Sequence, residues 1–145
     1  MNVLSIEALP NTAENDVLDV SVLLIEEHRS IRESLADWLA FVLVDAPVIG
    51  TSFDDAPCMI AAYRPEIIVV DIALKGREAI EMVGTLKELA PTARLVALCG
   101  YADRRCCESV LRAGADACLP AWEVRKALAS VLRELMADGG SRPGP

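Results

Sequence analysis

The segment Pro65-Glu66-Ile67-Ile68-Val69-Val70-Asp71 decides the fold of this chain. Residues 67–70 are all β-branched, a composition that favours an extended strand over a helix. No polar residue interrupts this run, so both faces of the strand are apolar, as they are inside a parallel sheet. The run stops at a carboxylate, Asp71. The segment therefore predicts a central parallel strand that carries an acid at its carboxyl end.

Strand-like and helix-like patterns alternate on either side of this segment. Apolar runs predict four more strands, at 20–25, 47–51, 94–99 and 117–119. Apolar residues at helical spacing predict five helices, at 31–42, 54–63, 77–90, 102–113 and 124–135. Five β-α units in succession predict an α/β fold, a doubly wound five-stranded parallel sheet with helices on both faces. The strand order that we expect is the flavodoxin-like order 2-1-3-4-5.

The two ends of the chain have a different composition from the middle. Residues 1–19 mix Asn, Asp, Glu and Pro with scattered apolar residues, and we expect an N-terminal tail. Residues 138–145 are rich in glycine and proline, so we expect a non-helical C-terminal tail or linker. The folded domain is expected to span residues 20–137.

Composition and charge exclude several classes of function. The 145 residues are 53% hydrophobic but only 4% aromatic, which predicts one aliphatic core. The formal net charge is −8, and no basic stripe is present, so this chain alone should not bind nucleic acid. No apolar run approaches the ~20 residues of a membrane span, and the start lacks a secretory signal pattern. We expect a cytoplasmic protein that does not bind membranes.

The sequence contains five cysteines and one histidine: Cys58, Cys99, Cys106, Cys107, Cys118 and His28. No Cys-x-x-Cys spacing occurs, so we do not expect a classical zinc site and interpret the cysteines as small buried apolar residues. Cys99 and Cys118 end adjacent predicted strands, and a redox-sensing disulfide between them is an alternative. Cys106 and Cys107 are successive on a helix and should point to different faces, which argues against a shared metal.

Three acids follow predicted strands. Glu26 and Glu27 come after the first strand, and Asp71 comes after the third. In the expected strand order these strands are neighbours, so the three carboxylates should converge where such sheets bind ligands. Converging like charges require a cation or a raised pKa, and an oxygen-rich site suits Mg²⁺. The alternative is that exposed strand ends simply favour acids at turns.

Three segments resemble those of one known family. Residues 22–33 (VLLIEEHRSIRE) are similar to the opening strand, acid pair and first helix of the receiver domains of bacterial two-component response regulators. Residues 65–76 (PEIIVVDIALKG) resemble the strand that carries the phosphorylated aspartate, together with the loop after it. Residues 113–117 (AGADA) are similar to the turn into the last strand. Over residues 20–137 the chain thus resembles a CheY-like receiver of an atypical kind.

The resemblance implies a role in phosphorelay signal transduction rather than enzymatic catalysis. Asp71 would accept a phosphoryl group from a histidine kinase or phosphotransfer protein. Glu27, assisted by Glu26, would hold Mg²⁺ together with Asp71, and the backbone carbonyl of Ala73 would be a further ligand. The resemblance also implies a homodimer through the face formed by the fourth helix, fifth strand and fifth helix.

Several positions depart from the family pattern. Cys99 replaces Thr or Ser, Ala121 replaces the lysine after the fifth strand, and Cys118 replaces the aromatic switch residue. The acid pair is Glu-Glu, where Asp-Asp or Glu-Asp is usual. We therefore expect a receiver with altered output, and the alternative is a pseudo-receiver that acts as a phosphorylation-independent protein-interaction module. Lys75 or Arg77 either supplies the missing positive charge or is a solvated loop cation.

Two further questions remain open from the sequence. An enzyme of this architecture, such as a hydrolase or flavin protein, is disfavoured because the chain has no glycine-rich phosphate loop, no Gly-x-Ser-x-Gly elbow and no second histidine. Trp122, at the start of the last predicted helix, is either a packed core residue or an anchor for a partner.

Overall fold

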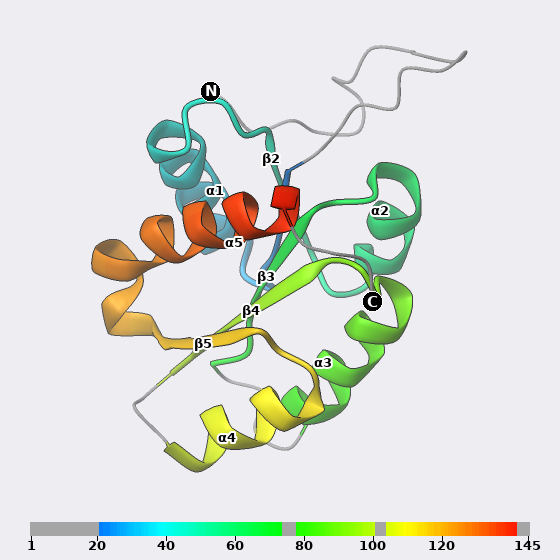
Figure 1. The fold of residues 1–145 in the computed structure, drawn as a ribbon. Helices are drawn as coiled ribbons and strands as arrows, with labels where there is room; N and C mark the ends of the chain where they lie inside the picture. The colour runs from blue at the N-terminus through cyan, green and yellow to red at the C-terminus, as the bar shows by residue number, and fades with distance from the viewer. Residues whose placement is uncertain (1–20, 74–77, 101–103, 142–145) are drawn as a thin grey trace.

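The computed structural model describes residues 21–73, 78–100 and 104–141, which form a parallel sheet between two layers of helices (Figure 1). The elements alternate along the chain in the order β1 (Val22–Ile25), α1 (Arg29–Val42), β2 (Val48–Thr51), α2 (Ala56–Tyr63), β3 (Ile67–Asp71), α3 (Glu78–Leu89), β4 (Arg94–Cys99), α4 (Arg104–Ala113) and β5 (Ala117–Pro120). A 3-10 turn (Ala121–Glu123) and a π-helical turn (Val124–Leu128) then lead into α5 (Ala129–Ser141).

The sheet has the expected topology. Its five strands lie in the order β2-β1-β3-β4-β5, and all four pairings are parallel. In register, Ile25 pairs with Val70 of β3, and Asp71 pairs with Leu98 of β4. The prediction of a doubly wound five-stranded sheet is confirmed, and β3 lies at its centre.

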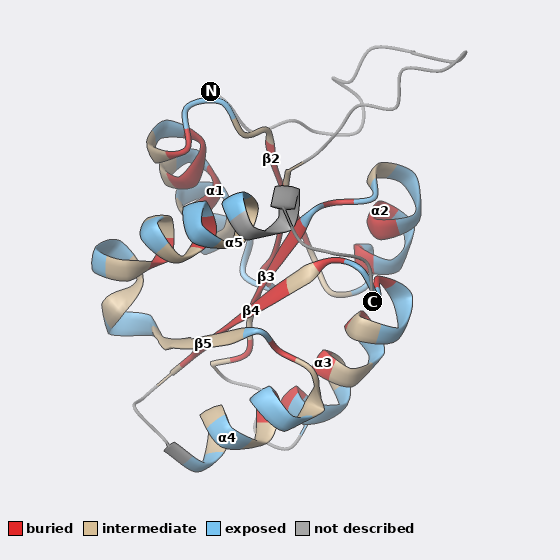
Figure 2. Ribbon diagram, viewed as in Figure 1, coloured by how far each residue is buried: buried red, intermediate tan, exposed pale blue. Residues whose placement is uncertain are grey.

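The central strands contribute side chains to two hydrophobic cores, one on each face of the sheet. Ile67 and Val69 pack with α1 and α5, in a cluster that also contains Leu128 and Leu132. Ile68 and Val70 pack on the opposite face, against α2, α3 and α4. Figure 2 shows the resulting pattern, in which the central strands are buried and the helices are exposed on their outer sides. The alternation follows from strand geometry, because successive side chains point to opposite faces.

The edge strand β5 differs from the central strands. Its four residues are only half-buried, and its last residue is Pro120, which pairs with Cys99 of β4. Proline has no backbone N–H and is tolerated in sheets at edges and strand ends. The strand therefore ends the sheet on this side.

The C-terminal boundary differs from the sequence prediction. We expected residues 138–145 to be non-helical, but α5 continues through Ser141 and includes Gly139 and Gly140. A glycine in a helix costs only about 1 kcal/mol relative to alanine, and a helix that is already nucleated gains a hydrogen bond with each added residue. The predicted tail at 1–19 and residues 142–145 lie outside the described residues. In the part of the chain that the structure describes, no helix is long and apolar enough to span a bilayer.

The packing of β1 can be tested with one core substitution. Leu23 is fully buried in the cluster below α2 and α3, whereas Phe41 on α1 is 76% exposed. We expect Leu23→Ala to lower the free energy of unfolding in urea by about 2–5 kcal/mol, because it removes buried apolar surface and leaves a cavity. Phe41→Ala should change it by less than about 0.5 kcal/mol. Equal effects of the two substitutions would contradict this account of the core.

Candidate functional site

A buried carboxylate lies beside the acid that ends β3. Because Ile25 and Val70 are in register, the next residues of the two strands, Glu26 and Asp71, follow side by side at the carboxyl edge of the sheet. Glu26 is only 4% exposed, and its backbone N–H donates to the carbonyl of Thr51 at 3.0 Å. Parallel pairing of β1 with both β2 and β3 thus fixes Glu26 at this edge.

The environment of Glu26 disfavours its charged form. Burial raises the pKa of the Glu26 carboxyl above its ordinary value, and the hydrogen bond to Asp71 and the negative charge there raise it further. The backbone N–H of His28 donates to Glu26 Oε2 at 2.9 Å and lowers the pKa in part. His28 Nδ1 lies 3.6 Å from the same oxygen, with the histidine side chain 58% exposed. The expected repulsion between converging acids is therefore present for Glu26 and Asp71.

Short backbone contacts hold the segment after β3. The backbone N–H of Ala73 donates to Asp71 Oδ1 at 2.9 Å, and the N–H of Ile72 donates to the carbonyl of Leu98 at 2.9 Å. Gly100 packs so closely that a Cβ there would lie 3.1 Å from the carbonyl oxygen of Ala73. The segment thus fixes one oxygen of Asp71 and positions the Ala73 carbonyl beside the chain that leaves β4.

The four predicted metal ligands do not all lie in equivalent environments. Glu26 is buried beside Asp71, Asp71 and Ala73 are half-buried in the same segment, and Glu27 is exposed. Oxygen donors of this kind fit Mg²⁺. A bound cation would favour the charged form of Glu26, which burial and the neighbouring Asp71 disfavour. The sequence reasoning gave Glu27 the leading role, whereas burial and contact with Asp71 distinguish Glu26.

A cavity of about 460 Å³ opens next to Asp71. It is lined by residues of α1, by Asp71 and Leu98 at the sheet edge, and by residues at the start of the last helix, namely Ser30, Ile31, Ser34, Leu35, Trp38, Ala121, Val124 and Arg125. Ala121 is small and exposed, so a long side chain does not fill this position. The cavity therefore extends past the position where the sequence departs from the lysine of receiver domains.

Arg125 is a residue of this cavity that the sequence reasoning missed. It stands one helical turn after Ala121, in the π-helical turn, and lines the cavity together with Asp71. That spacing was the available signal, because a cation one turn beyond the missing lysine faces the same region. The loop cations that we considered instead, Lys75 and Arg77, lie outside the described residues.

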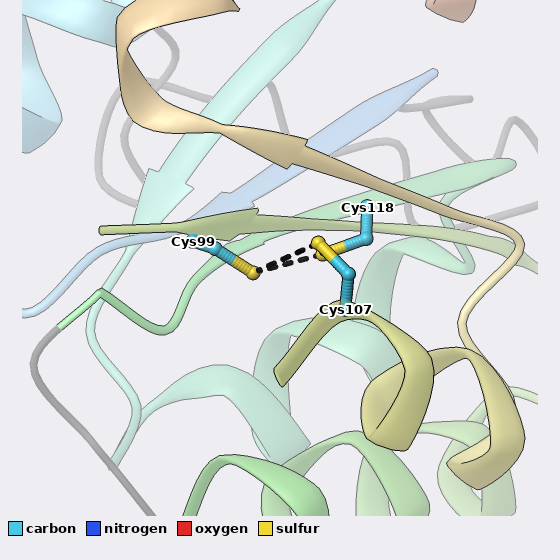
Figure 3. Close-up of side chains that lie close together, drawn as sticks. All are labelled: Cys99, Cys107 and Cys118. Atoms are coloured by element: carbon cyan, nitrogen blue, oxygen red, sulfur yellow. Dashed lines mark hydrogen bonds between the residues drawn. The ribbon is translucent and has the colours of Figure 1, made fainter. Parts of the chain in front are cut away.

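The switch-position cysteines lie on the other side of the sheet from the cavity. Leu98 lines the cavity, and the next residue, Cys99, points to the opposite face, toward α4 (Figure 3). Cys99 Sγ lies 2.8 Å from Cys118 Sγ, so the expected approach of these two sulfurs is confirmed.

Two expectations about the cysteines were wrong, and the exposure of Trp122 decides between the two alternatives left open for it. Cys106 and Cys107 do not diverge, since their sulfurs lie 3.8 and 3.7 Å from Cys99 Sγ. Both sulfurs lie near that of Cys99 because α4 packs against β4 and β5. Cys58 is exposed rather than buried. Trp122 is 61% exposed, which excludes the packed-core interpretation and leaves it as a surface side chain beside β5.

Comparisons with solved structures identify the fold. No protein-family model matches the sequence. The structure is similar to a signal receiver domain of a DNA-binding response regulator from Colwellia psychrerythraea 34H, with a TM-score of 0.71, 19% identity and coverage of 82% of this chain and 99% of that one. The structure is also similar to a response regulator from Thermotoga maritima, with a TM-score of 0.67 and 17% identity. That match covers 83% of this chain and 99% of the other. A LuxR family DNA-binding response regulator from Silicibacter pomeroyi matches with a TM-score of 0.67 and 22% identity, over 81% of this chain and 93% of that one. The chain has the fold of response-regulator receiver domains at low sequence identity.

The raised pKa of Glu26 leads to a testable dependence of stability on pH. Because the pKa is higher in the folded state, that state binds the proton more readily, and stability falls as pH rises from the ordinary value of 4.5 through the folded value. Glu26→Gln removes this loss. In metal-free buffer we expect the free energy of unfolding of the variant, relative to that of the wild type, to be higher at pH 8 than at pH 5.

Urea unfolding in EDTA at the two pH values measures this difference. Glu88→Gln, at an exposed position of α3, is the matched control and should follow the wild type at both. A difference between Glu26→Gln and wild type that is the same at pH 5 and pH 8 would show that the Glu26 carboxyl is not perturbed in the folded protein.

Proposed function

We propose that this chain is a receiver module of two-component signal transduction that accepts a phosphoryl group on Asp71. The supporting observation is the buried Glu26 carboxylate beside Asp71 at the carboxyl ends of β1 and β3. A buried acid beside a second, half-buried acid lowers stability, so its presence at the edge where such sheets bind ligands favours a functional role. The receiver fold found in the comparisons agrees with this proposal.

The residues of the site divide the work of phosphoryl transfer among them. Asp71 is the nucleophile, and the Ala73 N–H holds its Oδ1, which leaves Oδ2 to attack. Glu26, Glu27, the Asp71 carboxylate and the Ala73 carbonyl would hold Mg²⁺, which when bound neutralises the charge that opposes attack. Fixing the attacking carboxylate in advance reduces the entropy lost on reaching the transition state.

Arg125 would supply the positive charge that the missing lysine supplies in receiver domains. It lines the same cavity as Asp71, where the lysine of receiver domains is replaced by Ala121. A guanidinium pairs with phosphoryl oxygens through two parallel hydrogen bonds, so it is suited to this role. The cavity itself gives a histidine kinase or phosphotransfer protein access to Asp71 along α1.

The output of such a receiver would differ from the usual one. Cys99 has no hydroxyl and Cys118 has no aromatic ring, so neither side chain of the usual relay from the phosphoryl group to an aromatic switch residue is present. A protein partner would instead meet the face formed by α4, β5 and α5, beside which Trp122 is exposed. A homodimer through this face is one form that the contact would take.

A second function is favoured by the same substitutions. The absence of both a hydroxyl at position 99 and a lysine at position 121 agrees with a pseudo-receiver, an interaction module that works without phosphorylation. The two functions differ in one measurable respect, since the pseudo-receiver forms no acyl phosphate at Asp71.

Chemical phosphorylation separates the two functions. We expect intact-mass spectrometry to show the gain of one phosphoryl group after incubation with acetyl phosphate and Mg²⁺. The gain should vanish in Asp71→Asn and in EDTA, because the attacking carboxylate or its charge neutralisation is then missing. No gain under conditions that label an ordinary receiver would contradict the phosphoacceptor role and favour the pseudo-receiver.

The role of Arg125 is tested by the rate of the same reaction. Arg125→Ala should slow labelling roughly tenfold, equivalent to about 1.4 kcal/mol of transition-state stabilisation. Lys126→Ala is the matched control, because Lys126 is an adjacent exposed cation that does not line the cavity. If both variants react at the wild-type rate, Arg125 does not contact the transferred group.

A further inference from the structure

Three cysteine sulfurs meet on the face of the sheet opposite to the phosphoacceptor cavity. Cys99 ends β4, Cys107 comes from α4 and Cys118 from β5 (Figure 3). The Cys118 sulfur lies 2.8 Å from that of Cys99 and 2.8 Å from that of Cys107, and the other two are 3.7 Å apart. All three sulfurs lie within 4.8 Å of one another. Elements separated in sequence thus place their thiols around a single point.

The surroundings of this cluster are apolar. Cys99 is 1% exposed, and Cys107 and Cys118 are half-buried against the core below α3 and α4. Burial raises the pKa of the Cys99 thiol far above its usual range, and that of Cys118 to about 12.

A disulfide does not account for the arrangement. Cys118 pairs across the sheet with Ala97, two residues before Cys99, so Cys99 and Cys118 are diagonal neighbours. A disulfide between any two of the three cysteines would leave the third sulfur without a partner. A single ion would contact all three sulfurs, which lie within 4.8 Å of one another.

We propose that Cys99, Cys107 and Cys118 bind one thiophilic metal ion, with Zn²⁺ as its representative. Thiolate donors select soft or borderline ions such as Zn²⁺ and Cu(I), and reject Mg²⁺. On binding, three Zn–S bonds form, the three thiol protons pass to solvent, and no atom changes oxidation state. The site is distinct from the Mg²⁺ site at Asp71, because it lies on the other face of β4.

The distances agree with a tetrahedral site after a small adjustment. With Zn–S bonds of about 2.3 Å, two sulfurs on one ion lie about 3.8 Å apart. The Cys99–Cys107 distance of 3.7 Å already matches, whereas the Cys118 sulfur would move by about 1 Å. The Cys106 sulfur lies 3.8 Å from that of Cys99 but does not belong to the group of three that are mutually within 4.8 Å, so solvent would supply the fourth ligand.

Metal binding at this position would join β4, α4 and β5. Two of its ligands, Cys99 and Cys118, occupy the positions of the missing hydroxyl and aromatic switch residues. The ion would therefore hold the face through which a receiver contacts its partners, independently of phosphorylation at Asp71. This proposal does not require the phosphoacceptor function to be correct.

The experiment uses the full chain, reduced and freed of metal. Titration with Co²⁺, a spectroscopic substitute for Zn²⁺, should produce the intense sulfur-to-metal charge-transfer bands of cobalt thiolates, and Zn²⁺ should abolish them. Native mass spectrometry should show one Zn²⁺ per chain. Cys107→Ser and Cys118→Ser should each lower the Zn²⁺ affinity, measured against a competing chelator, at least tenfold.

Two controls keep the result interpretable. Cys58→Ser removes an exposed cysteine outside the cluster and should bind Zn²⁺ as tightly as the wild type. Asp71→Asn should also bind normally, which separates this site from the phosphoacceptor site. Circular dichroism of each variant establishes that it is folded. Absence of the charge-transfer bands in the reduced wild type, or unchanged affinity in folded Cys107→Ser and Cys118→Ser, would overturn the proposal.

Discussion

The burial of β3 on both faces is the constraint on which the rest of the structure depends. Four consecutive β-branched residues leave no side of the strand that water can cover at low cost, and each fully buried side chain contributes about 1.5–3 kcal/mol. Strands β1 and β4 must therefore satisfy its two backbone edges, and helices must cover both of its faces. With β1 held on one side, Asp71 has Glu26 as its neighbour at the carboxyl edge, so the geometry of the acidic site follows from the packing of an apolar strand.

The two faces of β4 serve different chemistry because neighbouring residues point in opposite directions. Leu98 faces the cavity beside Asp71, and Cys99 faces the thiol cluster under α4. The oxygen donors suited to Mg²⁺ and the sulfur donors suited to softer ions thus lie on opposite faces of β4. A substitution at the family's hydroxyl position alters one face and leaves the carboxylates of the other in place.

The sequence was sufficient for those features that depend on regular periodicity. Apolar runs and crossover rules predict the parallel sheet, and the flavodoxin-like strand order, once adopted, places β3 at the centre and Glu26 beside Asp71. Features that depend on the exact path of a helix were missed. The approach of Cys106 and Cys107 to Cys99 can be predicted only when the placement of α4 against β4 is known. The position of Arg125 depends on the irregular turns before α5. The exposure of Glu27, next to a buried Glu26, depends on where β1 stops.

Pro120 at the end of β5 determines how this protein can associate with others. The strand is the outermost one of the sheet, and its final residue lacks the N–H through which an incoming strand would bond. Extension of the sheet into a continuous intermolecular ribbon is therefore interrupted at this margin. Association there has to be specified by side-chain shape, for which the exposed indole of Trp122 is the large neighbouring group. One imino acid thus removes a backbone donor at the point where an added strand would have to begin or end.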